Sequence, residues 1–217
     1  MAGTITALEI QKRNKERVNV YLDNEFALAV TVMAAASLRK GQFLNDGAIN
    51  QLKAADDRAK AYDRAVRFLG FRPRSQNEVE RYLQEKGYTP EVCVEVVNRL
   101  IEQKYLDDAE FVRFWLENRE QFKPRGERAL RYELRQKGIA DSLIDAAVGE
   151  VNESDLAWAA VERKLYSWKN LPEPELKKKL AGFLSRRGFN YETVNEIMQR
   201  AKNSLNLSGT DTSFREE

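Results

Sequence analysis

The 217-residue sequence contains no histidine and a single cysteine, Cys93. Histidine is the commonest general base and the commonest metal ligand, so its absence removes the most frequent routes to acid–base and metal-dependent catalysis. One cysteine cannot form an internal disulfide, which favours a reducing, cytoplasmic environment. The motifs GxxxxGK[ST], GxSxG and CxxC are also absent. We therefore expect no catalytic residue, cofactor or metal site, and interpret the chain as a binding protein.

Long apolar runs are missing as well. No stretch approaches the roughly 18 apolar residues that a membrane span requires. The first ten residues lack the basic flank and apolar segment of a secretory signal. Charged residues make up 32% of the chain and hydrophobic residues 42%, a balance typical of a soluble, charge-rich helical protein. We expect a cytoplasmic protein without membrane contact.

The N-terminal segment is predicted to be rich in β-strands. Val18, Val20 and Leu22 alternate with polar or amphipathic residues, the pattern of a half-buried strand. Asp23-Asn24 favours a two-residue turn, because both residues tolerate positive φ. The predicted elements are strands over residues 5–11, 17–22 and 25–29 in an antiparallel meander, a short helix over 33–38, and a further helix capped by Asp46.

The rest of the chain contains three copies of one pattern, in which a proline is followed fourteen residues later by a glycine. Apolar residues recur four and eight positions before each glycine and six and nine positions after it, which predicts two amphipathic helices separated by a glycine stop. The glycine is expected in the left-handed conformation and the proline in the first turn of the middle helix. The pairs are Pro73–Gly87, Pro124–Gly138 and Pro174–Gly188, and a helix precedes each proline, over residues 58–69, 107–120 and 154–168.

These elements predict a mainly α protein, a tandem array of three three-helix repeats preceded by a small β-meander and a short helix. The expected divisions are a β-rich extension over residues 1–55, repeats over 56–105, 106–152 and 153–204, and a disordered tail over 205–217.

Basic side chains are the strongest candidates for a binding surface. Residues 121–138 carry six basic and two acidic side chains, and Arg125, Arg128, Arg131 and Arg135 are spaced so that they share one helix face. Planar guanidinium groups in such a row suit phosphate or carboxylate recognition, although a solvated polar face has the same pattern. The full predicted partner- or nucleic-acid-binding set is Arg72, Arg74, Lys123, Arg125, Arg128, Arg131, Arg135, Lys137, Lys177, Lys178, Arg186 and Arg187.

Two other features are interpreted as structural. Phe111, Phe114 and Trp115 have the spacing of a helix face, so we expect them in the core rather than in base stacking. Cys93 lies among valines at a helical position and is expected to be a buried apolar residue, not a nucleophile.

Several short motifs lie between Arg64 and Ile139: RPRS at residues 72–75, YLDD at 105–108, KPRG at 123–126 and the helix ends KGY and KGI. In these motifs and their order the chain resembles the RecX family of bacterial recombination regulators, and the resemblance extends over residues 58–203. It implies an array of three-helix repeats that binds the RecA recombinase and its nucleoprotein filament and restrains strand exchange and the SOS response. The family-pattern positions are Arg72, Arg74, Tyr105, Asp107, Asp108, Lys123, Pro124, Arg125 and Gly126.

Two other hypotheses remain open from the residues alone. The repeats can grip duplex DNA directly, or carboxylates can support a nuclease activity. The resemblance leads us to expect contact with the RecA filament, with single- or double-stranded DNA as a secondary contact. We expect the chain to be a monomer. End capping, groove binding and subunit removal are alternative modes of inhibition.

Overall fold

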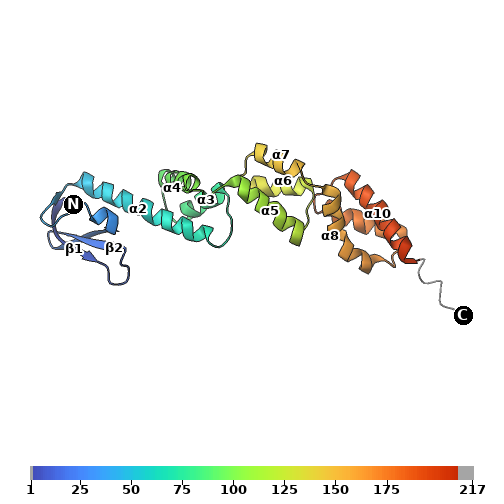
Figure 1. Cartoon of the computed structure of the whole chain (residues 1–217), viewed down its shortest axis with the longest axis horizontal. Coiled ribbons are helices and arrows are strands. Elements are labelled where there is room, and N and C mark those ends of the chain that lie inside the picture. Colours follow the sequence, from blue (N-terminus) through green and yellow to red (C-terminus); the bar gives the residue numbers. More distant parts are fainter. Residues whose placement is uncertain (1, 210–217) are drawn as a thin grey trace. The chain divides into compact units, whose positions relative to one another are not determined.

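The computed structural model describes residues 2–209, which divide into two compact units between Leu106 and Asp107. The first unit contains a four-stranded antiparallel sheet and the first three-helix repeat, and the second unit contains two more repeats (Figure 1). The predicted fold class is confirmed: a mainly helical chain with three helical repeats behind a small antiparallel sheet.

The sheet has the strand order β3-β2-β1-β4. The strands are β1 (Gly3–Ile10), β2 (Arg17–Leu22), β3 (Glu25–Thr31) and β4 (Phe43–Leu44), so the three predicted strands are present and a short fourth one pairs with β1. Val18, Val20 and Leu22 are buried as their alternation predicted. Asp23 and Asn24 both have positive φ, as expected for the tight turn between β2 and β3.

Helix α1 (Val32–Ala35) is shorter than predicted, and α2 (Asp46–Leu69) is much longer. The cap of α2 is Asn45, whose side chain accepts a hydrogen bond from the Ala48 amide, so the prediction of Asp46 as the cap was wrong. Helix α2 is a single helix of 24 residues that passes through the expected division at residues 55–56. The sheet and the first repeat therefore share one helix.

A buried ion pair joins the sheet to α2. The Arg17 guanidinium, on β2, lies 2.9 Å (Nη2 to Oδ2) from the carboxylate of Asp56, on α2, and also donates to the carbonyl of Ala29. Lys60 Nζ is 2.7 Å from the same carboxylate oxygen. Asp56 is only 6% exposed, so its buried carboxylate anchors the sheet to α2, the helix that also forms part of the first repeat.

Each repeat consists of three consecutive helices. The first uses the C-terminal half of α2 with α3 (Gln76–Glu85) and α4 (Pro90–Glu102). The second comprises α5 (Asp108–Phe122), α6 (Glu127–Gln136) and α7 (Asp141–Gly149). The third comprises α8 (Glu153–Trp168), α9 (Glu173–Ser185) and α10 (Tyr191–Gly209). The second and third repeats share one hydrophobic core, while the first has its own.

The glycine and capping signals behave as predicted. Gly87, Gly138 and Gly188 have φ of 86°, 76° and 84°, the left-handed conformation that ends the middle helices. Ser75 and Glu78 form a complete capping box. The Asp107 side chain caps α5 by accepting hydrogen bonds from the amides of Ala109 and Glu110.

The prolines differ from the prediction. Only Pro174 lies in the first turn of its helix, α9. Pro73 and Pro124 precede the helix caps Ser75 and Gly126, so the cap residues, not the prolines, set the start of α3 and α6. The tail was predicted to start at residue 205, but α10 continues to Gly209; residues 210–217, on which the rest of this prediction falls, lie outside the described part of the chain.

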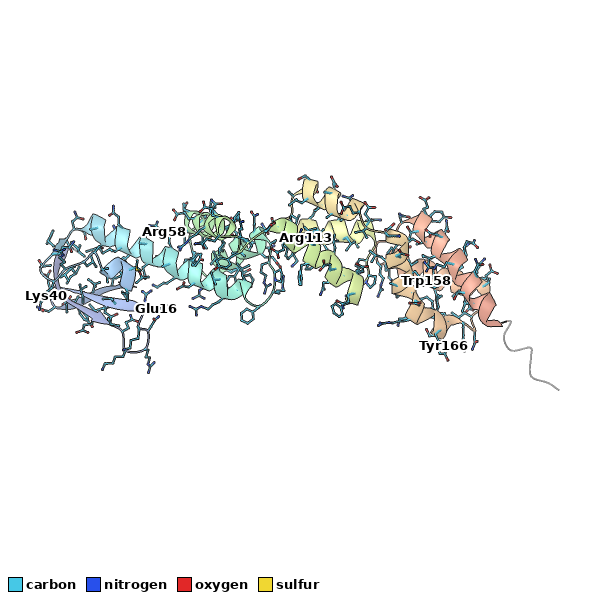
Figure 2. All side chains as sticks on the ribbon, viewed as in Figure 1. Glu16, Lys40, Arg58, Arg113, Trp158 and Tyr166 are labelled. Carbon is cyan, nitrogen blue, oxygen red and sulfur yellow. The ribbon has the colours of Figure 1, made fainter. Side chains whose placement is uncertain are left out.

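The structural interpretations of Cys93 and Phe111 are confirmed. Both are buried in repeat cores, at 0% and 1% exposure. Burial is the main cause that raises the pKa of the Cys93 thiol, which disfavours the nucleophilic thiolate. Tyr166, in contrast, projects from α8 into solvent with 77% of its surface exposed (Figure 2).

Candidate binding cleft between the second and third repeats

An open cleft of ≈ 850 Å³ lies within the second unit, between α6 and the connection from α9 to α10. Its walls come from the two sides of the boundary between repeats. Four arginines and two tyrosines are among the lining residues. The lining includes Glu127, Arg128, Ala129, Arg131, Tyr132, Arg135, Glu153, Arg186, Gly188, Phe189 and Tyr191.

Two glycines allow the repeats to approach closely at the base of this cleft. A Cβ atom on Gly126 would lie 2.4 Å from the carbonyl carbon and oxygen of Gly188, so a larger residue cannot fit there. The Gly126 amide donates to the Arg187 carbonyl at 3.0 Å. A Cβ atom on Gly188 would in turn lie 2.5 Å from the Cβ of Ala129. The glycines of KPRG and RRG thus form a direct contact between backbones.

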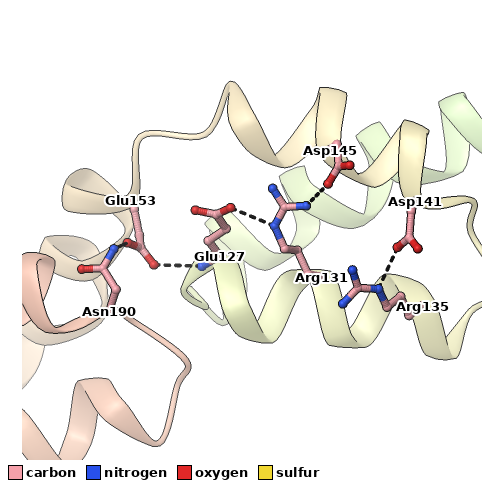
Figure 3. Close-up of polar contacts among 7 residues, drawn as sticks. All are labelled: Glu127, Arg131, Arg135, Asp141, Asp145, Glu153 and Asn190. Atoms are coloured by element: carbon pink, nitrogen blue, oxygen red, sulfur yellow. Dashed lines mark hydrogen bonds and ion pairs between the residues drawn. The ribbon is translucent and has the colours of Figure 1, made fainter.

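The carboxylate of Glu153 fastens the same boundary (Figure 3). Its Oε1 accepts a hydrogen bond from the Glu127 amide at 2.9 Å, and its Oε2 accepts from Asn190 Nδ2 at 2.5 Å and Thr193 Oγ1 at 2.8 Å. The acceptor lies at the start of α8, while the donors belong to the start of α6 and the start of α10. One side chain at the start of the third repeat therefore connects its first helix, α8, to the start of its last helix, α10, and to the second repeat.

Two arginines of the predicted basic face are engaged in ion pairs. Arg131 contacts the carboxylates of Glu127, at 2.8 Å, and Asp145, and Arg135 Nε lies 2.7 Å from Asp141 (Figure 3). Hydrogen bonds to Glu127 and then Asp145 raise the pKa of Arg131. Acidic side chains therefore pair with two arginines of this face: Glu127 from α6 itself, and Asp141 and Asp145 from α7.

Arg128 and Arg186 are different. Both are exposed, both line the cleft, and neither makes an ion pair or a hydrogen bond through its side chain with any residue of the described chain. Arg128 lies on α6 and Arg186 caps the end of α9. Tyr132 and Tyr191 stand beside them with 64% and 80% of their surfaces exposed. The cleft thus offers unpaired guanidinium groups next to solvent-facing aromatic rings.

Arg125, Lys137 and Arg187 are outside the cleft lining. Arg125 precedes α6 instead of sharing its exposed face, and its Nε is 3.6 Å from Glu133 Oε1. Lys137 Nζ lies 5.2 Å above the Trp115 ring, and the Arg187 guanidinium lies 4.0 Å above the Phe183 ring. Burial first, and then the charges of Arg125 and Arg186, lower the pKa of Arg187. These three side chains are held by intramolecular contacts.

The remaining predicted residues do not join the cleft either. Lys123, Lys177 and Lys178 are exposed and do not line it. Arg72 and Arg74 belong to the first unit. Arg72 Nη2 lies 2.9 Å from Glu78, and the Arg74 guanidinium lies 3.9 Å from the centre of the Phe68 ring. Of the twelve predicted residues, four line the cleft, namely Arg128, Arg131, Arg135 and Arg186.

Sequence reasoning missed Glu153, Tyr132 and Tyr191. A usable signal existed for the glycine contact, since the first repeat has Ser75 at the position of Gly126, two residues after the proline. No comparable signal marks Glu153, because the residues that donate to it lie 26, 37 and 40 positions away along the chain.

The described residues hold no group of three or more histidine, cysteine, aspartate or glutamate side chains able to bind a metal ion. Nor does any helix within residues 2–209 combine the length and the apolar character needed to cross a membrane.

Four family models match consecutive parts of the chain. They are described as the regulatory protein RecX N-terminal domain, over residues 3–45, and the first, second and third three-helix domains of RecX, over residues 61–100, 107–148 and 152–198.

Relatives match over most of their own length. The chain is 35% identical to the regulatory protein RecX of Bacillus subtilis, covering 90% of this chain and 76% of that protein. It is 33% identical to that of Lactobacillus delbrueckii, covering 90% and 73%. A crystal structure of regulatory protein RecX superposes with a TM-score of 0.73 at 28% identity, over 91% of this chain and 99% of the other. A RecX structure from Lactobacillus salivarius, at 21% identity and a TM-score of 0.61, shares the fold. The chain therefore belongs to the RecX family of regulatory proteins.

Proposed function

We propose that this chain is a non-enzymatic regulator that binds the RecA recombinase filament and restrains its activity in recombination, DNA repair and the SOS response. Family membership over the sheet and all three repeats is the observation that carries the proposal. The RecX relatives are named as regulatory proteins, and RecA is the recombinase that the family resemblance implies as partner. On this proposal the protein acts in the cytoplasm, as a monomer.

The cleft adds chemical support. Regulation by occupying another protein requires an accessible surface with anchoring side chains, and not a catalytic constellation. Arg128, Arg186, Tyr132 and Tyr191 supply exposed arginine and tyrosine side chains, two of the three residue types most enriched at the energetic centres of interfaces. The proposal leaves the choice between end capping, groove binding and subunit removal to experiment.

The test is the ATPase activity of RecA on single-stranded DNA, titrated with this protein. We expect the steady-state rate to fall as the protein is added, and we expect the protein to co-sediment with preformed filaments. Ovalbumin at the same concentrations serves as the inert control. An unchanged ATPase rate together with no co-sedimentation would rule out the proposal.

The alternative, a helical-repeat protein that binds DNA directly, is favoured by the arginine and tyrosine side chains that share one cleft. Affinity for naked duplex at several salt concentrations separates the two. A DNA-binding protein that neutralises several phosphates shows log K falling with log salt at a slope of about −0.9 per phosphate. Tight, steeply salt-dependent binding to naked duplex without preference for filaments would favour the alternative.

A further inference from the structure

We propose that the cleft between α6 and the α9–α10 connection receives a short acidic segment of the filament protein, and not a DNA strand. The inference rests on the proposed function and names the surface and the chemistry of the contact. The segment places carboxylates on Arg128 and Arg186 and an apolar side chain between them, against Tyr132 and Tyr191.

The cleft is built before any partner arrives. The Gly126–Gly188 contact and the three hydrogen bonds accepted by Glu153 fix one wall relative to the other. The floor includes Ala129 and the buried Phe189, which belongs to the shared core of the two repeats. A surface that is already ordered avoids much of the entropy cost of binding, so this cleft suits a docking site better than an adaptable loop would.

The charge distribution argues against a nucleic-acid strand. Arg131 and Arg135 are already paired with Glu127, Asp145 and Asp141, so the row of three arginines on α6 leaves Arg128 alone unpaired among the described residues. A polyphosphate backbone requires a continuous positive track and would meet these carboxylates. Two separate guanidinium groups are better suited to isolated carboxylates, each of which they bind in a planar, two-point geometry.

The aromatic side chains indicate the body of the segment. Tyrosine provides a large, rigid contact area at a low cost in side-chain entropy, and its hydroxyl stays compatible with water at the rim. Tyr132 and Tyr191 are the exposed large apolar side chains of the cleft, and they come from opposite sides of the repeat boundary. An acidic–apolar–acidic order along the partner chain satisfies both kinds of group.

Site-specific photo-crosslinking tests this inference on the whole chain. Tyr191 is replaced by p-benzoylphenylalanine, and the protein is irradiated with RecA filaments on labelled single-stranded DNA. We expect crosslinks to the RecA polypeptide that mass spectrometry maps to a segment with acidic residues around an apolar one. The matched control carries the same photoreactive residue in place of Tyr166, which is similarly exposed on α8 but lies outside the cleft. It should give a markedly lower yield.

A charge-reversal pair gives the second measurement. The double variant Arg128→Glu with Arg186→Glu is expected to raise the apparent Kd for filaments, measured by co-sedimentation, by about tenfold or more, because the reversed charges repel the acidic segment. Arg163→Glu with Lys164→Glu, at exposed positions of α8, reverses the same number of charges outside the cleft and outside the predicted binding set, and should change the apparent Kd by less than about twofold. Circular dichroism and tryptophan fluorescence check that both variants remain folded.

The outcomes separate the two levels of the proposal. If the wild-type protein fails to bind filaments, the proposed function fails and this inference fails with it. If the wild type binds but crosslinks from position 191 go mainly to DNA, or are no stronger than those from position 166, only the acidic-segment inference is overturned. Equal loss of binding in the two charge-reversal variants overturns it as well.

Discussion

Arg119 Nε lies 2.7 Å from the Glu133 carboxylate in the second repeat. The equivalent positions of the first repeat hold Phe68 and Tyr82, whose rings are stacked. Counted from the proline of each repeat, Arg119 corresponds to Phe68 and Glu133 to Tyr82. Arg125, which is 3.6 Å from Glu133, corresponds to Arg74, which lies over the Phe68 ring. One place in the repeat is thus filled by an ion pair in the second copy and by parallel rings, 4.0 Å apart, in the first.

Substituting Glu133→Gln tests what the ion pair contributes. The carboxylate accepts from Arg119 and from Trp115 Nε1, and all three side chains are partly buried. Loss of the charge leaves two guanidinium groups without their carboxylate, so we expect the free energy of unfolding to fall by about 1–3 kcal/mol. Urea unfolding followed by tryptophan fluorescence measures the change, since all three tryptophans lie in the second unit. Glu162→Gln, at an exposed position on α8, is the control and should be neutral.

Replacing the Arg119–Glu133 ion pair by the stacked rings of the first repeat is predicted to restore stability. Arg119→Phe combined with Glu133→Tyr recreates the stacked pair of the first repeat and leaves Arg125 in the place of Arg74. We expect the double variant to recover about half or more of the stability lost in Glu133→Gln, because neither partner is left as an unpaired charge. A double variant less stable than Glu133→Gln would show that the two arrangements are not interchangeable.

Glu153→Ala should loosen the boundary between the second and third repeats. It removes the acceptor for the Glu127 amide, Asn190 and Thr193. Hydrogen bonds to a charged group contribute about 1.5–3 kcal/mol each, so we expect a loss of about 2 kcal/mol or more. Hydrogen exchange at the Glu127 amide is the direct measurement and should become faster. Glu192→Ala, on the exposed side of α10, should leave this amide protected.

Gly126→Ala should destabilise the second unit through a clash and not through backbone strain. Gly126 has φ of −73°, which any residue adopts, but an added Cβ meets the Gly188 backbone at 2.4 Å. We expect a cost of about 1–3 kcal/mol in urea unfolding. Gly149→Ala, where nothing lies within 4 Å and φ is not positive, is the matched control and should be neutral or slightly stabilising. Equal effects of the two substitutions would contradict the close approach.

The Arg17–Asp56 pair predicts an acid-sensitive sheet. Burial tends to raise the pKa of Asp56, but hydrogen bonds and charges from Arg17 and Lys60 outweigh it, so the pKa is lowered. A lowered pKa stabilises the fold above the ordinary value of about 3.9 and loses that contribution as pH falls through the folded-state value. We expect Asp56→Asn to weaken hydrogen-exchange protection of Val20 and Val30 at pH 7, with a smaller difference from wild type near pH 3. The neighbouring exposed Asp57→Asn should show neither effect.

Much of the fold was predictable because its signals are local. Each repeat glycine follows a basic residue and ends a helix with its own left-handed backbone, and the spacing of apolar residues around it defines two helix faces. The continuous helix across residues 55–56 was not predictable in this way, since the division there was inferred from a change in composition. No glycine or proline interrupts residues 48–69, and this lack of a stop signal is what permits the single helix α2.

The candidate site was predictable only in part. The row of arginines on α6 was visible from spacing, but its neutralisation by Asp141 and Asp145 depends on how α7 folds back beside α6. Tyr132 and Tyr191 lie 59 positions apart, and only the packing of two repeats brings them to one cleft. Contacts between side chains so far apart in the chain produce no periodic pattern in the sequence.

Helix α2 fixes the rotation of the first repeat relative to the sheet, about the helix axis. Ile49 faces the core of the sheet, and Ala61 and Ala65 face the core of the repeat, on one uninterrupted helix. Each added residue turns everything beyond it by about 100°, so an insertion of one or two residues between positions 56 and 61 would rotate the whole first repeat, α3 and α4 included, relative to the sheet. Length changes close to whole turns, such as seven residues, keep the phase within about 20°. Homologous chains should therefore vary in the length of this helix by whole turns or not at all.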